Sequence, residues 1–130
     1  MSTESIIVAA IKATAPITAL IGSSPTRLYP DTVLQGSVLP AMAYQRISTP
    51  RVTNIKGESN LARVRIQLTI HASNPTAREQ TFNAVKAAFN GYTDKANGID
   101  RILVSDGRYT YEPTTKTYAC TVDLIVWAYE

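Results

Sequence analysis

The chain has 130 residues, of which 45% are hydrophobic and 18% are charged, and its formal net charge at pH 7 is +3. This balance is typical of a folded protein and excludes a chain that is disordered throughout. One domain is expected over residues 1–130, because that length is enough to build one hydrophobic core. No run approaches the roughly 20 apolar residues of a membrane helix, so no membrane partner is predicted. The single cysteine, Cys120, excludes an intramolecular disulfide.

The N-terminal region predicts two consecutive helices. Glu4 suits the positive end of a helix dipole, and apolar residues recur at helical spacing from there to Ala13. Pro16 predicts a break followed by a second short helix, which Gly22 can end. Residues 27–29 then predict a short strand. Because the region before the apolar stretch carries an acid and no base, a secretory leader is not expected.

The segment from Leu39 to Ala72 predicts two amphipathic strands that form a long ribbon. Alternation is strictest from Ala62 to Ala72, where even-numbered residues are apolar and odd-numbered residues are polar. A strand of about 12 residues reaches about 40 Å, which is long for a domain of this size. Residues 48–60 between the strands have few apolar side chains and predict a loop. The ribbon is therefore expected to protrude from its own domain.

The ribbon carries the whole excess of positive charge. Residues 46–65 hold five bases and one acid, a balance of +4, while the rest of the chain holds eight bases and nine acids, a balance of −1. Three interpretations remain open: a solvated face that protects an edge strand, a contact with a protein partner, or a contact with nucleic acid. The tip has no aromatic residues on which bases could stack, which argues against sequence-specific recognition of nucleic acid.

The second half of the chain predicts a helix followed by strands. Asn74 is a natural N-cap, Pro75 fits the first helical position, and Gly91 can stop the helix after Asn90. Phe82, Val85 and Phe89 form its apolar stripe, whereas Arg78, Glu79, Asn83 and Lys86 are expected to face water.

Two further strands are predicted around a turn signal. Residues 102–105 predict a strand, and the Asp106-Gly107 pair that follows is typical of a hairpin turn. We therefore expect residues 108–112 to pair antiparallel with that strand.

The last strand, residues 118–129, is apolar on both faces toward its end. One face carries alternate apolar residues, and the other carries Ile125, Trp127 and Tyr129. A strand that is apolar on both faces is normally covered on both, and a neighbouring subunit is one way to cover it. The order of elements predicts an α+β fold: a mostly antiparallel sheet, with an N-terminal helix and one central helix packed on one face, and a long protruding β-ribbon.

The residues with catalytic or metal-binding chemistry do not form a recognisable site. The only histidine, His71, lies on the polar side of a strand, and one histidine with one cysteine cannot supply a usual zinc site. Nucleophile-elbow, phosphate-loop and dinucleotide motifs are missing from the sequence. We therefore predict no enzymatic activity, no catalytic or metal-binding residues and no cofactor.

The order of these features resembles the tail terminator, or tail-completion, proteins of long-tailed bacteriophages and prophages. The resemblance covers nearly the whole chain and is carried by the order of its structural patterns. The matching stretches are "IIVAAIKATAPITALIG", "RLYPD", "LPAMAYQRIS", "ARVRIQLTIHASNPTAREQTFNAVKAAFNG" and "YACTVDLIVWAYE".

The resemblance implies a structural virion protein that forms a ring, typically a hexamer. Such a ring caps the head-proximal end of the tail tube, ends tube growth and offers the surface to which the filled head joins. The implied partners are further copies of the chain, the major tail-tube protein, a head-side connector or stopper protein, and genome DNA that passes through the bore without sequence-specific binding. The implied location is the virion, after assembly in the cytoplasm of the bacterial host.

The resemblance therefore implies that the charged ribbon lies at a subunit interface or in the bore. It also implies that the last strand, which is apolar on both faces, lies at a subunit contact. The predicted interface or bore residues are Arg46, Arg51, Lys56, Glu58, Arg63 and Arg65, and the predicted subunit-contact residues are Ile125, Trp127 and Tyr129. A solvated strand face explains the charged residues equally well. Alternative functions are another neck component, such as a connector or stopper ring, a small nucleic-acid-binding module, or a hydrolase without a recognisable site.

Overall fold

A computed structural model describes residues 3–22, 26–33, 38–48, 51–54, 57–105 and 107–129, with side chains except at residues 48, 51–54 and 57–61. The fold is α+β, as the sequence predicted, with a seven-stranded sheet. The elements in chain order are α1 (Thr3–Ala13), α2 (Ala15–Ile21), β1 (Leu28–Pro30), β2 (Ala41–Ser48), β3 (Arg51–Asn54), β4 (Gly57–Ala72), α3 (Pro75–Phe89), the 3₁₀ turn η1 (Lys95–Asn97), β5 (Ile99–Val104), β6 (Arg108–Glu112) and β7 (Thr117–Tyr129).

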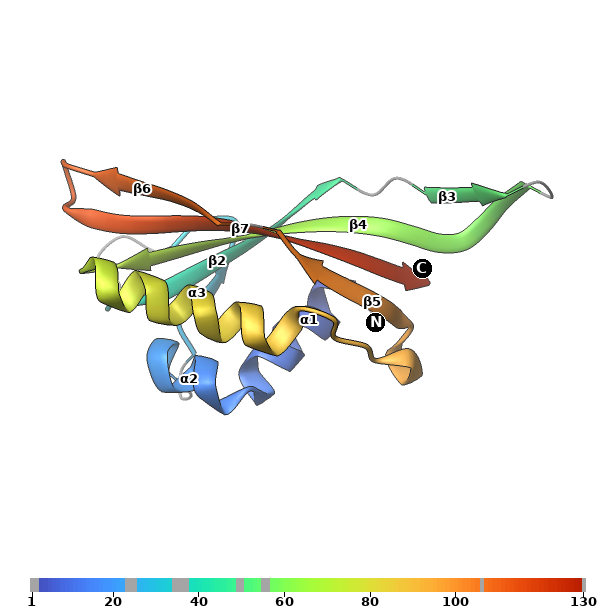
Figure 1. The fold of residues 1–130 in the computed structure, drawn as a ribbon, viewed down its shortest axis with the longest axis horizontal. Coiled ribbons are helices and arrows are strands. Elements are labelled where there is room, and N and C mark those ends of the chain that lie inside the picture. Colours follow the sequence, from blue (N-terminus) through green and yellow to red (C-terminus); the bar gives the residue numbers. More distant parts are fainter. Residues whose placement is uncertain are drawn as a thin grey trace.

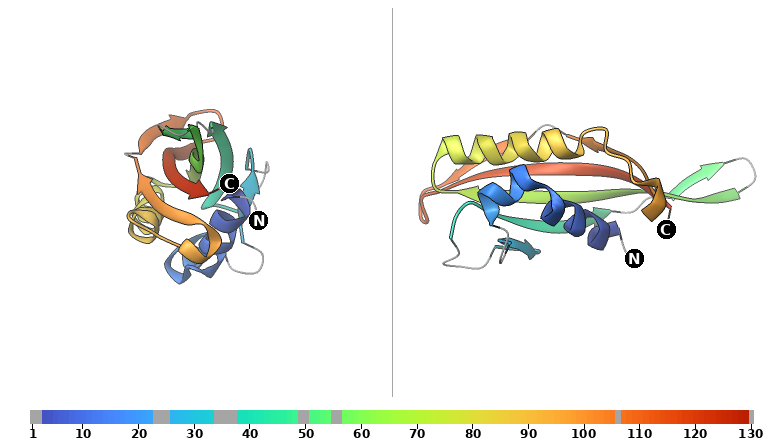
Figure 2. Two further views of the ribbon diagram at one scale, coloured as in Figure 1. Left: turned by 90° about the vertical axis from the view of Figure 1, so that its right-hand side faces the viewer. Right: turned by 90° about the horizontal axis from the view of Figure 1, so that it is seen from below.

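The sheet is long, twisted and covered by helices on one face only. Its main strand order is β1-β2-β4-β7-β5, with β3 paired to β4 and β6 paired to β7. All strand pairs are antiparallel except β1 with β2. Figures 1 and 2 show α1, α2 and α3 packed together on the same side of this sheet. We call the side that faces the helices the inner face and the opposite side the outer face.

The two N-terminal helices confirm the predicted break and stop. Thr14 separates them, and its Oγ1 donates a hydrogen bond of 2.7 Å to the Ala10 carbonyl oxygen. Pro16 lies in the first turn of α2, where no helical partner exists for its missing N–H. Gly22 follows α2 with φ of 91°, a conformation that L side chains rarely adopt. The helices meet at a bend of 85°.

Helix α3 begins and ends as the sequence predicted. Asn74 Oδ1 accepts a hydrogen bond of 2.7 Å from the Ala77 N–H, and Gly91 follows the helix with φ of 81°. Its stripe of Phe82, Val85 and Phe89 is buried against the sheet. The core therefore lies between α1, α2 and α3 and the inner-face side chains of β4 and β7, among which are Val64, Ile66, Leu68, Ile70, Val122, Leu124 and Val126.

Arg78 of α3 does not face water as predicted. Its guanidinium lies 4.7 Å from the Tyr109 ring centroid and 5.4 Å from the Tyr118 ring centroid. Its Nη1 donates a hydrogen bond of 3.1 Å to the Thr110 carbonyl oxygen. The helical pattern placed Arg78 on the polar side of α3, but the β6-β7 hairpin extends beneath the first turns of the helix and provides aromatic faces for the cation.

The ribbon forms and protrudes, but the segment predicted as its loop is largely strand. β3 pairs with β4 through Arg51 with Ala62, Thr53 with Glu58 and Asn54 with Gly57. β3 and the start of β4 project beyond the helices at one end of the molecule (Figures 1 and 2). Main-chain hydrogen bonds form a strand pair without an apolar side-chain pattern, which is why the polar sequence predicted a loop here. We call residues 51–54 with residues 57–61 the arm.

The predicted hairpin at Asp106-Gly107 is wrong. β5 and β6 both pair antiparallel with β7, one after the other: Val104 opposes Leu124, and Arg108 opposes Thr121. The true hairpin turn lies at residues 113–116, between β6 and β7. Gly107 is required for packing, because a Cβ at this position would lie 2.6 Å from the Cys120 Sγ. Gly107 therefore marks a close approach of the chain before β6 to the Cys120 side chain of β7.

Candidate functional site

The outer face of the sheet, at the end nearer the arm, gathers arginine and aromatic side chains in rows. Trp127 on the central strand β7 has Arg63 of β4 directly opposite on one side and Arg101 of β5 on the other. One row further along, Ile125 has Arg65 on one side and Leu103 on the other. Directly opposite residues on one face have Cβ atoms about 5 Å apart, so these side chains lie next to one another. We call these six residues with Tyr129 the outer patch.

The outer patch is open to solvent and largely apolar at its centre. Tyr129 is 60% exposed and Leu103 is 41% exposed, whereas Trp127 and Ile125 are half-buried. The Arg63 guanidinium carbon lies 5.9 Å from the Trp127 ring centroid, within the range of a cation–π contact. Apolar area of this kind, bordered by arginines, is the composition of a protein-binding surface.

Arg65 is held by an ion pair on this face. Its Nη2 donates to the Asp123 Oδ2, and the Asp123 carboxylate is only 14% exposed. The second carboxylate oxygen, Oδ1, is buried and has no hydrogen-bond partner among the described residues. The pair therefore neutralises one cation of the patch, and leaves Asp123 dependent on Arg65 for its compensation.

Arg46 lies on the inner face of the sheet, away from Arg63 and Arg65. It opposes Ile66, a core residue, in the β2–β4 register, and its Nε donates a hydrogen bond of 2.8 Å to the Glu4 Oε1 of α1. Arg46 therefore lies apart from Arg63 and Arg65, and its role as an interface or bore residue stays a prediction. Alternation along β2 puts Arg46 beside the helices, where it ties α1 to the sheet.

The remaining predicted ribbon residues lie in or beside the arm. Arg51 belongs to β3 and Glu58 to β4, in the part of the ribbon whose side chains are not described. Lys56 lies outside the described residues. These three stay predictions. Of the predicted residues whose side chains the structure describes, it brings together Arg63, Arg65, Ile125, Trp127 and Tyr129.

Three residues of this face escaped the sequence analysis. Arg101, Leu103 and Arg108 come from β5 and β6, which the sequence placed in a separate hairpin. Arg101 pairs with Trp127 and Arg108 with Thr121, so both point outward. The signal that could have found them is the alternation of Arg101 and Leu103 with the buried Ile102, but it becomes informative only once β5 is known to border β7.

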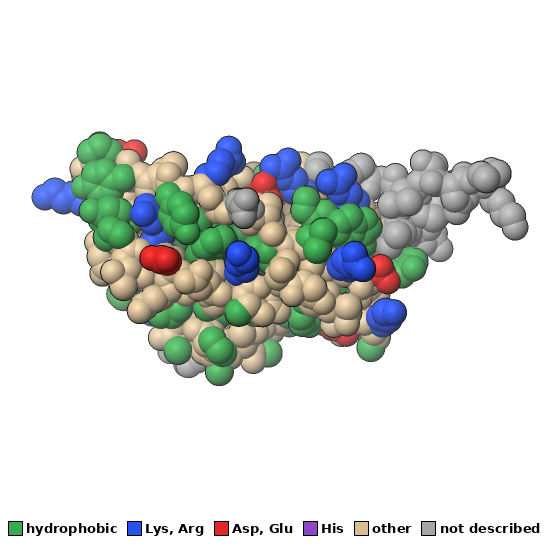
Figure 3. Space-filling view, viewed as in Figure 1, with side chains coloured by type: hydrophobic (Ala, Val, Ile, Leu, Met, Phe, Trp, Pro, Cys, Tyr) green, Lys and Arg blue, Asp and Glu red, His purple; other side chains and the backbone are tan. Residues whose placement is uncertain are grey.

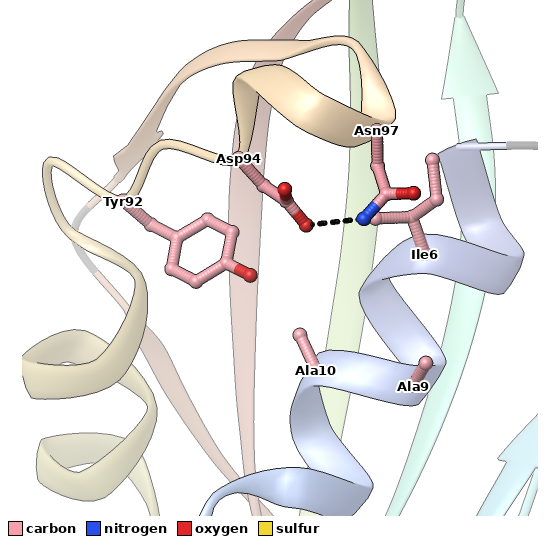
Figure 4. A pocket seen from close by; sticks show the side chains of 6 residues that line it. All are labelled: Ile6, Ala9, Ala10, Tyr92, Asp94 and Asn97. Carbon is pink, nitrogen blue, oxygen red and sulfur yellow. Dashed lines mark hydrogen bonds between the residues drawn. The ribbon is translucent and has the colours of Figure 1, made fainter.

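The described part of the chain has a small pocket beside its first helix. The pocket in Figure 4 lies between α1 and η1, has a volume of about 150 Å³, and is lined partly by Tyr92 and Asp94. Asn97 Nδ2 donates a hydrogen bond of 2.8 Å to Asp94 Oδ2, and burial, followed by the Asp94 charge, raises the pKa of Tyr92. No three metal-ligating side chains meet among the described residues, and none of the described helices alone is long and apolar enough to span a membrane.

The chain as a whole is similar to known proteins of phage-like particles. The family model described as "Tail completion protein gp17" matches residues 6–129. Among solved structures, a chain of the "Virion of native gene transfer agent (GTA) particle" shares the fold, with a TM-score of 0.67 and 13% sequence identity, over 95% of this chain and 92% of that chain. No curated protein sequence matches the chain significantly.

Proposed function

Because this chain belongs to the tail completion protein gp17 family of bacteriophage tail structural proteins, we propose that it assembles into a closed ring of identical subunits, six in number, at the head-proximal end of the tail tube. The ring ends tube polymerisation and forms the surface that joins the head. The subunits assemble in the host cytoplasm and remain in the virion.

The observation that carries this proposal is the outer patch. Trp, Tyr and Arg are the residue types that dominate the binding energy of protein interfaces. Trp127, flanked by Arg63 and Arg101 in register, places all three types with Tyr129 on one uncovered sheet face. The exposed apolar area of this arrangement is stabilised when another surface covers it.

The shape of the subunit favours a ring over a face-to-face dimer. The arm projects at one end of the long axis, and the β6-β7 hairpin forms the other end (Figure 1). Two such copies pressed together by their outer patches would oppose arginine to arginine. A subunit that offers different surfaces at its two ends makes heterologous contacts, which close into a ring when the rotation per subunit allows it.

The basic side chains on the face drawn in Figure 3 suit passage of DNA without tight binding. In the view of Figure 3, Lys and Arg side chains are spread among hydrophobic and acidic ones rather than gathered into one continuous patch. Nucleic-acid affinity rises with the number of phosphates that a protein contacts at once. A dispersed set of cations suits a bore wall past which DNA slides, without sequence-specific contacts.

A connector or stopper ring is the second candidate, and the same patch supports it equally. The two differ only in the partner, which is the tail-tube protein for a terminator and a portal-side protein for a stopper. The discriminating observation is therefore which of the two proteins the outer patch binds.

The test measures the mass of the purified chain, alone and mixed with tail-tube protein, by light scattering, with negative-stain imaging of the same samples. We expect six-fold rings, or tubes that stop growing and carry a cap at one end. The variant Trp127→Ala should lose the cap, and Lys86→Ala on the exposed side of α3 serves as the control. Capped tubes from Trp127→Ala would contradict the role of the patch. A chain that ignores tubes but binds portal-side protein would favour the stopper.

A further inference from the structure

The edges of the sheet differ in whether their main-chain groups are already bonded. The edge of β5 is closed by the segment that follows α3. Ile102 N donates a hydrogen bond of 3.0 Å to the Tyr92 carbonyl oxygen, and Ile99 and Asp94 exchange two hydrogen bonds, of 2.9 and 3.0 Å. The Gly91 N–H donates to the Ile102 carbonyl oxygen at 2.8 Å. No strand of another chain can add along β5, since these groups are taken.

The β6 edge is open in the described structure. Ser105 N donates to the Asp123 carbonyl oxygen, and Tyr129 N donates to the Gly98 carbonyl oxygen, each at 2.9 Å. Odd-numbered residues of β7 therefore direct their N–H and C=O groups toward β5 and β6. Thr110, which opposes Ala119, is bonded to β7 by this alternation, and its neighbours Tyr109 and Tyr111 direct their main-chain groups away from β7. Outside the β6–β7 ladder, no main-chain group of the described residues bonds the N–H or C=O of either tyrosine.

A second open edge lies at the opposite end of the molecule. β1 covers β2 only as far as Tyr44, and β3 then takes over the pairing with β4. No described strand pairs with the other side of β3. β3 has four residues and β6 has five, so the two open edges match in length.

We propose that neighbouring copies of this chain join by strand addition, with the arm of one copy pairing along the β6 edge of the next. The contact deepens the proposed ring and rests on it, because a donor at one end and an acceptor at the other make each junction head-to-tail. Main-chain hydrogen bonds would supply the attachment, so the contact requires no apolar sequence pattern in the arm. The strand addition would give the protruding arm a role in assembly, whereas the arm has no role in the core of its own domain.

The test uses Tyr111, whose N–H faces the open edge and whose ring is 48% exposed. Tyr111→Pro removes that N–H at an edge position where proline is tolerated in a sheet. Tyr111→Ala is the matched control, because it loses the same contact with the Tyr118 ring but keeps the N–H. Circular dichroism and thermal unfolding check that both variants fold.

We expect Tyr111→Pro to weaken self-association about tenfold or more in light scattering, because it loses one main-chain hydrogen bond and adds a ring at the contact. Tyr111→Ala should associate like the wild type. A second variant replaces residues 51–60 with a short glycine-serine link. At a concentration below the weakened dissociation constant of Tyr111→Pro, each variant alone should stay monomeric. A mixture at the same concentration should form a dimer and nothing larger, because one chain keeps the edge and the other keeps the arm.

The outcomes separate this inference from the proposed ring. If Tyr111→Pro assembles as well as the wild type, or if two folded variants fail to form the mixed dimer, the strand addition is wrong and the ring stands. If the wild type forms open chains with the expected variant behaviour, the strand addition stands and the closed ring is wrong. A wild type that stays monomeric in all samples, with and without tube protein, overturns both. If the arm-deleted chain does not fold, the comparison of the two Tyr111 variants decides alone.

Discussion

Arg46 Nε donates a hydrogen bond of 2.8 Å to Glu4 Oε1, and this ion pair ties the first turn of α1 to strand β2. The two side chains are about 30% exposed, at 28% and 32%, so the pair is partly shielded from water. Two residues that are 42 positions apart in the sequence thus hold the first helix against the sheet. The same contact holds Arg46 on the inner face, so its role in meeting a partner stays a prediction.

Breaking this pair should destabilise the fold modestly. Glu4→Gln or Arg46→Ala is expected to lower the free energy of unfolding by about 0.5–1 kcal/mol, the range of partly exposed ion pairs. Urea unfolding of the two single variants and the double variant gives the coupling between them. Arg63→Ala is the control, because Arg63 is exposed and makes no ion pair in the described structure. A coupling of zero would show that the contact does not hold α1.

Gly107 should tolerate no side chain while Cys120 is present. Gly107→Ala places a Cβ 2.6 Å from the Cys120 Sγ and 3.3 Å from the Phe82 Cε1, so it should cost about 1–3 kcal/mol of stability through overpacking. Cys120→Ala removes the closest atom, and the double variant should therefore lose less than the sum of the two single variants.

Gly91→Ala is the matched control for that experiment. Its cost comes from a φ of 81°, and a Cβ there would meet nothing within 4 Å. Cys120→Ala should leave the effect of Gly91→Ala unchanged, because the two positions share no contact. Equal non-additivity at both glycines, measured by denaturant unfolding, would rule out the steric explanation.

His71 should make the protein less stable in mild acid. Burial between the neighbouring strands, where Ala41 and Ala119 lie opposite, lowers the pKa of His71 from its ordinary 6.5. Below pH 6.5 the unfolded chain takes up a proton more readily than the folded one, so stability falls as the pH drops from 6.5 toward the lowered value.

The variant His71→Gln isolates this effect. We expect its free energy of unfolding to depend less on pH than that of the wild type between pH 7 and about 5, with the difference confined to the acidic side of the window. Identical slopes in the two proteins, from urea unfolding at each pH, would show that other groups set the acid sensitivity.

Reversing exposed charges of the outer patch should block assembly without unfolding the chain. Arg63→Glu with Arg101→Glu is expected to change the free energy of unfolding by less than about 0.5 kcal/mol. Tail completion, measured as the yield of tailed particles, should be lost because both substituted residues flank Trp127. Lys12→Glu with Lys86→Glu makes the same charge change on exposed helix positions and should keep the yield normal.

Arg65 is less suited to this test than Arg63 and Arg101. Arg65→Glu would place a second carboxylate beside Asp123, whose own carboxylate is 14% exposed and paired with Arg65. A fall in particle yield would then combine lost folding with lost contact. If Arg63→Glu with Arg101→Glu leaves the yield unchanged, the outer patch is not a required interface.

Local chemistry made the helices predictable. Pro16, Gly22, Asn74 and Gly91 each restrict or extend the allowed backbone angles at one position, and their effect does not depend on distant residues. The alternation from Ala62 to Ala72 likewise identified the inner and outer faces of β4, because a half-buried strand requires it. These features recovered the α+β fold and the protruding ribbon.

The partners of the strands were not predictable from local signals. Asp106-Gly107 has the composition of a hairpin turn, yet β5 and β6 run on along the same side of β7. Arg78 was placed on a water-facing helix side, yet the β6-β7 hairpin covers it. In both cases the deciding contact comes from a strand far along the chain.

The sequence by itself determined where the helices begin and end, which residues of β4 are buried, and that Ile125, Trp127 and Tyr129 share a strand face. Only the tertiary structure decided that Arg63 and Arg101 flank Trp127, that Arg46 turns inward to Glu4, and which sheet edges are closed. The physical reason is that periodicity and backbone restrictions act within a few residues. The register between strands instead depends on packing and hydrogen bonds between segments 40 or more residues apart, as between β4 and β7.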